Sequence, residues 1–310
     1  MRVCSLRDVT SLHKLKIGYF ADGPWAHQAL NRILADISLD VAFICARYDC
    51  PDPRLQEMAR AHDLPFITHP SINSPEFREL MLRFNCDIFV SMSFNQIFRK
   101  ELIHLPNMGT INCHAGKLPF YRGRNILNWV LINDEQEFGI TAHYMDEGID
   151  TGDVLVQKNL PISDEDNYRT VLERAYSACA EVLHIAIKQL QAGTAKPWKQ
   201  STVHPVGFYC CARQDGDEVL DWKQTSREVF NFVRALCLPG PQARTFLRGQ
   251  EMRIEKVQLI PKAPNYRGIP GVVVGKNEDS FVVKTADSTI RIVQWEYPSK
   301  VRIGDRLTPN

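Results

Sequence analysis

The sequence lacks most of the short motifs that identify common enzyme classes. No Gly-x-Gly-x-x-Gly follows the first apolar run, and Gly275-Lys276 has neither the upstream glycine nor the following hydroxyl residue of a phosphate-binding loop. His-Glu-x-x-His and Gly-x-Ser-x-Gly do not occur. These absences argue against an ordinary dinucleotide site, a P-loop nucleotide site, a zinc protease and a serine hydrolase.

An excess of charge of either sign is also missing. The 37 lysine and arginine residues balance 36 aspartate and glutamate residues, for a formal net charge of +1. Such a balance leaves no whole-chain electrostatic signature for nucleic acid or for a membrane surface. No long charge-free apolar run occurs, and no early apolar run is flanked by basic residues. We therefore expect a soluble, cytoplasmic protein without a membrane partner.

Paired cysteine motifs are absent as well. The nine cysteines are odd in number, and no Cys-x-x-Cys occurs. Free thiols in a reducing cytoplasm are the expected state. No pairs of cysteine or histidine have the spacing of zinc ligands, so we expect no metal site.

Short apolar runs alternate with amphipathic helical patterns in the first half of the chain. This alternation predicts βαβ units with right-handed crossovers, hence an α/β, Rossmann-like, mostly parallel sheet. The expected strands are residues 15–20, 41–46, 64–67 and 87–91, and the expected helices begin at Pro24, Pro53 and Pro75, with a short one over 97–105.

The second half changes character after a long helix expected from Ser163 to about Gly193. Proline and glycine mark residues 196–207 as a linker. Thr225 and Glu228 form a predicted capping box for a helix. Strands expected at 252–260, 271–275, 281–285 and 289–295 then indicate a small β-rich, barrel-like domain. We predict a catalytic domain over residues 1–200 and a C-terminal β-rich domain over 201–310.

Polar residues able to do chemistry follow a predicted strand at Thr110–Ile111. Asn112 and His114 fall at the carboxyl end of this strand, where ligand crevices of parallel sheets lie. An acidic loop comes later, with Asp146, Glu147, Asp150 and Asp153. An amide, an imidazole and a carboxylate suit acyl transfer to an amine, which needs an oxyanion donor and a proton acceptor. The alternative is that Asn112 and His114 only cap the loop that follows.

The stretch Asn-Cys-His-Ala-Gly-Lys-Leu-Pro-Phe-Tyr-Arg-Gly-Arg-Asn-Ile-Leu-Asn-Trp at 112–129, with Gly-Ile-Thr at 139–141 and Ile-Asp-Thr-Gly-Asp at 149–153, resembles the N10-formyltetrahydrofolate-dependent formyltransferases. Leu-Asp-Trp at 220–222 and Pro-Gly-Pro at 239–241 resemble the second domain of two branches. One is the sugar N-formyltransferases, such as the formyltransferase half of the enzyme acting on UDP-4-amino-4-deoxy-arabinose. The other is methionyl-tRNA formyltransferase. Glycinamide ribonucleotide formyltransferase is similar only in the first domain.

The resemblance implies a catalytic trio of Asn112, His114 and Asp150. The asparagine would polarise the formyl oxygen, the histidine would handle the proton or oxyanion, and the aspartate would hold the histidine and assist proton removal. The cosubstrate would be N10-formyltetrahydrofolate, with no metal or covalent intermediate. Its implied contacts are Gln96, Ile97, Phe98, Arg124, Asp146, Glu147, Gly148 and Ile149.

Departures from the family pattern concern the acceptor of the formyl group. The family's usual His-Gly-Ser-Leu-Leu-Pro is His-Ala-Gly-Lys-Leu-Pro here, and Asn125-Ile126 replaces Ala-Pro. Lys117 would meet a phosphate or carboxylate of the acceptor, or would be an ordinary solvated lysine. Tyr121 and Arg122 either shape their loop or bind substrate. We assign Lys117, Tyr121 and Arg122 to substrate binding.

The preferred acceptor is a nucleotide-linked amino sugar, as in the biosynthesis of lipopolysaccharide or another glycan. The alternative acceptor is methionyl-tRNA, which would require a basic surface. Residues 205–310 carry 16 lysine and arginine against 12 aspartate and glutamate residues, a net +4 that neither makes nor excludes such a surface. A folate- or nucleotide-binding module without catalysis is a third hypothesis. The base, the sugar and the oligomeric state are not specified by the sequence.

Three other residues carry open alternatives. Trp25 would stack on a nucleotide base or pack in a half-buried position. His143 would line the site or be a satisfied strand histidine. Cys113, between two candidate catalytic residues, is expected to be a small buried spacer rather than a nucleophile.

Overall fold

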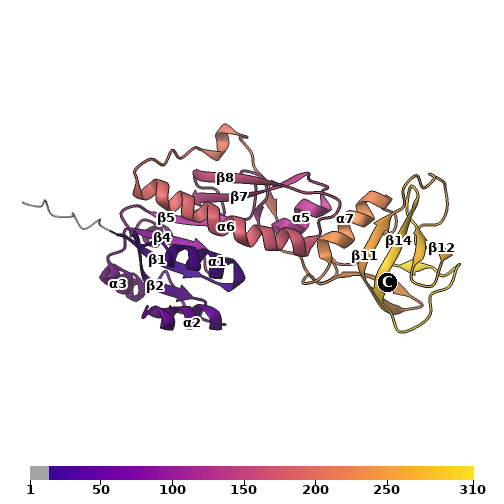
Figure 1. Cartoon of the computed structure of the whole chain (residues 1–310), viewed down its shortest axis with the longest axis horizontal. Coiled ribbons are helices and arrows are strands. Elements are labelled where there is room, and N and C mark those ends of the chain that lie inside the picture. The colour runs from indigo at the N-terminus through magenta and orange to yellow at the C-terminus, as the bar shows by residue number, and fades with distance from the viewer. Residues whose placement is uncertain (1–13) are drawn as a thin grey trace, which may run out of the picture. The chain divides into compact units, whose positions relative to one another are not determined.

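The computed structural model describes residues 14–310, and a seven-stranded sheet organises the first part of the chain (Figure 1). Its strands are β1 (Leu15–Ala21), β2 (Leu39–Ala46), β3 (Phe66–Thr68), β4 (Ile88–Met92), β5 (Thr110–His114), β7 (Glu137–Tyr144) and β8 (Val154–Pro161). They lie in the order β3-β2-β1-β4-β5-β7-β8. Strands β1 to β5 pair in parallel, whereas β5 and β7 are antiparallel. The prediction of a mostly parallel α/β sheet is confirmed.

The helices of this part are α1 (Gly23–Leu34), α2 (Pro53–Ala61), α3 (Pro75–Phe84), α4 (Lys100–Ile103), α5 (Ile126–Ile132) and α6 (Tyr168–Gln191). Of these, α2 and α3 begin at the predicted prolines, and α1 begins one residue before Pro24. The Asp52 carboxylate accepts a hydrogen bond from the Leu55 amide, and the Ser74 hydroxyl accepts one from the Phe77 amide. Each bond satisfies an amide that the first helical turn leaves unpaired.

Aromatic side chains fill the core on one side of β1. Phe20 contacts the rings of Phe43 and Phe89 edge-on, at centroid distances of 5.5 and 5.2 Å. Gly18 permits this packing, because a Cβ there would lie 2.5 Å from the Phe43 ring and 2.7 Å from the Phe89 ring. Any side chain at position 18 would displace both rings, and this core fixes β1 against its two neighbours.

Two helices are shorter than predicted because side chains compete for their first turns. The helix expected over 97–105 is only Lys100–Ile103. Upstream of it, the Asn73 amide donates to the Ile97 carbonyl while its oxygen accepts from the Arg99 amide. The helix expected from Ser163 begins at Tyr168. There the Asp166 carboxylate accepts from the Ser163 amide, so the chain turns before the helix starts.

The C-terminal part holds a six-stranded antiparallel sheet beside one helix, α7 (Ser226–Leu236). The strands are β10 (Ala243–Leu247), β11 (Gln250–Leu259), β12 (Val273–Lys276), β13 (Phe281–Lys284), β14 (Thr289–Glu296) and β15 (Leu307–Thr308), in the order β12-β13-β14-β11-β10-β15. Both halves of the Thr225–Glu228 capping box are present. Helix α7 lies beside β11 (Figure 1). The predicted β-rich second part is confirmed.

The described chain divides into two compact units. The first comprises the residues up to His114, Thr141–Gln157 and Tyr176–Thr202, and the second comprises Ala115–Ile140, Lys158–Ala175 and Val203–Asn310. A short parallel pair, β6 (Arg122–Gly123) with β9 (Tyr209–Cys210), belongs to the second unit. The domain boundary at residue 200 stays a prediction.

The structure also shows the state of the cysteines and the character of the helices. The eight cysteines within residues 14–310 are free, and Cys4 lies outside the described residues. None of the helices in the described part of the chain combines the length and the apolar character needed to cross a membrane.

Candidate active site

Strand β5 and the part of β7 that belongs to the first unit, residues 141–144, bring three candidate side chains together. In their antiparallel register Asn112 lies opposite His143, and His114 lies opposite Thr141. Residues 112 and 114 are two apart, so they share a face of the sheet. The strand continues through His114, whereas the sequence placed both residues just beyond its end. His114 and His143 are buried.

The loop between β7 and β8 carries Asp150 to this face. Asp150 has a left-handed backbone (φ +55°), which is uncommon for a residue with a side chain. The Gln200 amide nitrogen donates hydrogen bonds of 2.8 Å to the carbonyls of both Asp150 and Gly152. Gly152 is required by close approach, because a Cβ there would lie 1.9 Å from the Tyr144 carbonyl oxygen. The loop conformation is therefore fixed at several points around Asp150.

The Asp150 carboxylate lies between two imidazole rings. Its Oδ2 is 3.5 Å from His114 Nδ1, and its Oδ1 is 3.5 Å from His143 Nε2. The Asp150 side chain is 11% exposed, and those of His114 and His143 are 10% and 2% exposed. At 3.5 Å these contacts are longer than good hydrogen bonds, as is common in active sites without substrate. The three side chains form one buried polar cluster.

The tautomer of His143 follows from its neighbours. Its Nδ1 lies 2.7 Å from the Tyr144 carbonyl, which can only accept, so Nδ1 carries a proton. With the ring neutral, Nε2 accepts from the Asn112 amide nitrogen at 3.4 Å. The same Nε2 is 3.5 Å from Asp150 Oδ1, so His143 lies between Asn112 and Asp150.

This arrangement suits acyl transfer to an amine. An amide donor and an imidazole can stabilise an oxyanion, and a carboxylate beside the imidazole can take the proton that the amine loses. The structure thus brings the predicted Asn112, His114 and Asp150 together, although their catalytic roles stay a prediction. His143, which the sequence left open, joins them.

Gln200 is a site residue that sequence reasoning missed. It lies within a stretch that we interpreted as a linker, and it begins a short 3-10 turn, Gln200–Thr202. Its side chain is 4% exposed. A single glutamine in an irregular segment has no periodicity or motif that would reveal its contact with residues 50 positions away.

The predicted cosubstrate contacts of the first unit lie on two loops. The Gln96 side chain accepts from the Ile72 amide and donates to the His69 carbonyl, so it braces the backbone. Phe98 is buried at 3% exposure, whereas Ile97 is 68% exposed. Asp146 accepts from the Gly148 amide at 3.1 Å. Residues 146–149 are all exposed and leave backbone groups accessible.

The predicted acceptor residues and Arg124 belong to the second unit, where most of them already have partners. The Lys117 ammonium pairs with the Glu137 carboxylate. The Tyr121 hydroxyl donates to Glu135 at 2.6 Å, and burial together with this contact holds the Tyr121 pKa well above its usual value. Arg122 lies over the Tyr209 ring at 5.5 Å from its centroid, and Arg124 is exposed.

The contacts of Trp25 and Cys113 bear on the alternatives left open for these two residues. Trp25 contacts the Tyr176 ring edge-on at 4.6 Å, which supports the packing role. Cys113 is 6% exposed, and its thiol faces the Cys179 carbonyl at 3.6 Å, as a buried spacer would. Within residues 14–310, no three histidine, cysteine, aspartate or glutamate side chains are grouped to hold a metal ion.

Comparison with known proteins identifies the family. Residues 42–187 match the formyl transferase model, and residues 214–304 match the model of the formyl transferase C-terminal domain. Methionyl-tRNA formyltransferase of Geobacter metallireducens is 31% identical over 95% of this chain and 97% of its own length.

Two of the solved structures with a similar fold are N-formyltransferases. WlaRD, a sugar 3N-formyl transferase solved with dTDP and 5-N-formyl-THF, has a TM-score of 0.69 at 22% identity, over 93% of this chain and all of that chain. The N-formyltransferase of Helicobacter canadensis, solved with folinic acid and dTDP-3-aminofucose, has a TM-score of 0.67 at 22% identity, over 91% of this chain and all of that chain. With both domain models and a full-length relative in agreement, this chain belongs to the formyl transferase family.

Proposed function

We propose that this chain transfers the formyl group of N10-formyltetrahydrofolate to the amino group of a nucleotide-linked amino sugar. The observation that carries the proposal is the convergence of Asn112 and His114 with the carboxylate of Asp150. Membership of the formyl transferase family supports the reaction type.

In the proposed reaction the acceptor amine forms a bond to the formyl carbon, and the bond from that carbon to N10 of the folate breaks. Asn112 and His114 donate to the oxygen that becomes negative as the amine attacks. Asp150, through His114, takes the proton that the amine loses and passes it on to N10. The folate then leaves as a neutral secondary amine, and the carboxylate of Asp150 is restored. Atoms and charges balance without a metal or an oxidant.

The donor would contact the loops of the first unit. The exposed residues Asp146–Ile149 offer backbone groups that can hydrogen-bond a pterin ring, and exposed Ile97 offers apolar contact beside the buried Phe98. Two structural neighbours were solved with formylated folates, which is consistent with this assignment. The Gln96 side chain also braces the backbone, through the Ile72 amide and the His69 carbonyl.

The small acceptor is favoured by how the second unit uses its cations. A tRNA platform needs many lysine and arginine side chains available to phosphates. Of the 16 cations in residues 205–310, at least eight are already engaged within the protein: Arg213, Arg227, Arg234, Arg244, Arg248, Arg253, Lys276 and Lys284. At least half of these cations are therefore already engaged, which reduces the number available to a polyanion.

Methionyl-tRNA remains the second candidate acceptor for one specific reason. The full-length relative at 31% identity is a methionyl-tRNA formyltransferase, whereas the sugar enzymes are similar at 22% identity.

A direct comparison of acceptors tests the proposal. Purified protein and N10-formyltetrahydrofolate are incubated with UDP-, dTDP- or GDP-linked amino sugars, and in parallel with initiator methionyl-tRNA. We expect mass spectrometry to detect one sugar nucleotide in which a formyl group replaces one hydrogen. Formylation of the tRNA and of no sugar would overturn the proposed acceptor. Transfer to neither acceptor class would overturn both candidates.

A further inference from the structure

A segment of the second unit, residues 203–213, covers the turn that contains the predicted acceptor residues. We call this segment the strap. The amides of Arg122 and Arg124 donate to the carbonyls of Phe208 and Cys210, at 3.2 and 3.1 Å. The Arg213 amide donates to the Asn125 side chain at 3.0 Å. The strap is thus attached to the turn by two backbone hydrogen bonds and by a third bond from its end to the Asn125 side chain.

Two glycines make this attachment close. A Cβ on Gly123 would lie 2.4 Å from the Cys210 carbonyl oxygen, and one on Gly207 would lie 2.2 Å from the Pro119 carbonyl oxygen. Gly123 also has a left-handed backbone, φ +95°. The strap and the turn therefore form one packed layer whose side chains have defined positions.

Aromatic rings line this layer and remain accessible. Phe208 contacts the rings of Phe120 and Tyr121, at 5.6 and 4.9 Å. Nevertheless Phe208 is 42% exposed, and Tyr209 beside it is 55% exposed. Val206 is 70% exposed. Such apolar exposure on an ordered segment marks an interaction site rather than a structural need.

The charged side chains of the strap and of residues 115–129 are all basic, and acidic partners come from elsewhere in the unit, such as Glu135 on the Tyr121 hydroxyl. Neither the strap nor residues 115–129 contain an aspartate or a glutamate. Lys117 and Arg213 pair with Glu137 and Glu218 from elsewhere in the unit. Arg122 lies over the ring of Tyr209, and Arg124 is exposed. An aromatic surface bordered by arginines is complementary to a ligand that is both flat and anionic.

We propose that the strap is the nucleotide-recognition surface of this enzyme, where the Tyr209 ring stacks on the base of a nucleoside diphosphate and Arg122 and Arg124 meet its phosphates. The proposal rests on the proposed function, because it names the part of the acceptor that this surface holds. Stacking tolerates any base, so the platform sets affinity for a nucleotide while other contacts select the base.

The test compares Tyr209→Ala with Tyr209→Phe, and uses Ile303→Ala as a matched exposed control in the same unit. Isothermal titration calorimetry measures binding of UDP, dTDP and GDP, and steady-state kinetics measure KM for the accepted sugar nucleotide and for N10-formyltetrahydrofolate. We expect Tyr209→Ala to weaken nucleotide binding and raise acceptor KM about tenfold or more, from the loss of one stacked base. Tyr209→Phe and Ile303→Ala should remain within about twofold of the parent, and the folate KM should not move.

Three outcomes would overturn the platform. One is sugar formylation with an unchanged acceptor KM in Tyr209→Ala, which leaves the proposed function intact. Another is an equal rise of the acceptor KM and the folate KM in Tyr209→Ala together with a lowered melting temperature, which would show that Tyr209 has a structural role. The third is self-association in sedimentation experiments that Tyr209→Ala abolishes without an effect on nucleotide binding. Failure of the proposed function is distinguishable, because no sugar nucleotide would then be formylated by the parent protein.

Discussion

The Asp150 carboxylate lies beside the imidazoles of both His114 and His143. Its substitution by asparagine should change the turnover rate without changing the fold. Asparagine tolerates the left-handed backbone at this position and preserves the side-chain shape. It cannot take a proton from His114, so we expect Asp150→Asn to lower kcat by about 10²- to 10⁴-fold. Circular dichroism and the melting temperature should stay close to those of the parent. Unchanged turnover would remove Asp150 from the catalytic group.

Gln200 is a positioning residue, since it acts through the backbone of the Asp150 loop. Gln200→Ala leaves the carbonyls of Asp150 and Gly152 without their buried donor. We expect kcat to fall roughly tenfold, while the KM for the acceptor changes little.

The control is Gln191→Ala, which removes a glutamine amide that donates to the Ser38 carbonyl elsewhere in the first unit. It should retain the kcat of the parent. A rise in acceptor KM without loss of kcat in Gln200→Ala would contradict the positioning role.

Individual site residues could be predicted from the sequence where they belong to a recognisable motif. The resemblance to the formyltransferases singled out Asn112, His114 and Asp150, and the structure brings these side chains together. The contact of His143 with Asp150 depends on the antiparallel register of β5 and β7, which no local pattern encodes. Lys117 was assigned to substrate, but its pairing with Glu137 requires knowledge of which strand lies beside its loop.

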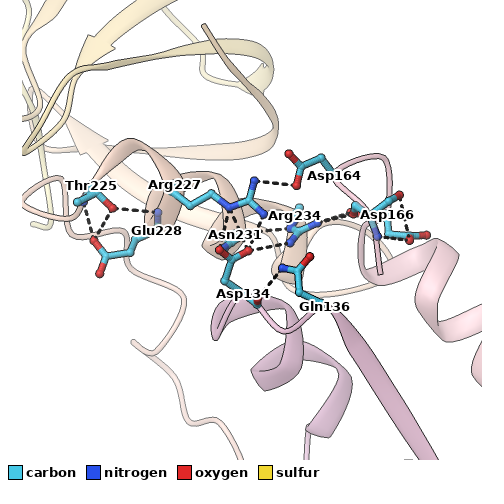
Figure 2. Close-up of polar contacts among 10 residues, drawn as sticks. Asp134, Gln136, Asp164, Asp166, Thr225, Arg227, Glu228, Asn231 and Arg234 are labelled. Atoms are coloured by element: carbon cyan, nitrogen blue, oxygen red, sulfur yellow. Dashed lines mark hydrogen bonds and ion pairs between the residues drawn. The ribbon is translucent and has the colours of Figure 1, made fainter. Parts of the chain in front are cut away.

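Among the elements, helix α7 is anchored by a buried arginine (Figure 2). Arg234 is 6% exposed, its Nε donates to Asn231, and its Nη1 donates to the carbonyl of Ser163. Beside it Arg227 pairs with Asp134 and Asp164. The helix thereby holds the 134–136 turn and the 163–166 loop within the second unit.

Replacing the buried arginine should therefore cost far more than replacing an exposed one. We expect Arg234→Met to lower the free energy of unfolding by about 3 kcal/mol, because it leaves buried acceptors without donors. Arg253→Met, which breaks an exposed pair with Glu251, should cost less than about 1 kcal/mol. Urea denaturation measures both variants. Equal small losses would show that the Arg234 contacts contribute little.

Element boundaries were predictable where a cap has a sequence signature. The Thr225–Glu228 box and the Ser74-Pro75 start of α3 are local, and both are confirmed. The helix predicted over 97–105 begins only at Lys100, because the side chain of Asn73, far away in sequence, hydrogen-bonds the backbone of its expected first turn. Strand β10, which we did not predict, pairs with β11 and β15 and is short.

For the whole molecule, acid sensitivity follows from carboxylates with lowered pKa values. The Ser38 hydroxyl, followed by its amide, His184 and Lys188, holds the pKa of Asp36 well below its usual value. Hydrogen bonds likewise lower the pKa of Asp166 and Asp287, despite their burial. A carboxyl whose folded pKa is depressed stabilises the fold above its unfolded pKa and loses that contribution as pH falls.

We accordingly expect the free energy of unfolding to fall as pH drops from about 5 toward 2. Asp36→Asn should be less stable than the parent at pH 7, and the gap should narrow below about pH 4. Urea titrations at several pH values test this. A gap that is constant with pH would mean that the Asp36 contacts do not depend on its charge.

The interleaved units make a truncated chain a sharp test of the predicted boundary. Residues 1–200 alone would keep Asp134 and the Ser163 carbonyl but lose Arg227 and Arg234, which satisfy them. We expect this fragment to unfold or aggregate, as judged by circular dichroism and size-exclusion chromatography. A cooperative, monomeric fragment would show that residues 1–200 form an independent domain.

The strap has one further property of practical use. It carries Cys211, an exposed thiol two residues from Tyr209, and only Cys50 is also exposed among the cysteines of residues 14–310. A protein with both Cys4 and Cys50 replaced by serine would thus keep one exposed thiol within residues 14–310, beside the platform. The alkylation rate of Cys211 then reports whether the platform is occupied, because a nucleotide stacked on Tyr209 should slow the reaction. Ligands can thus be screened without the formyl donor and without turnover.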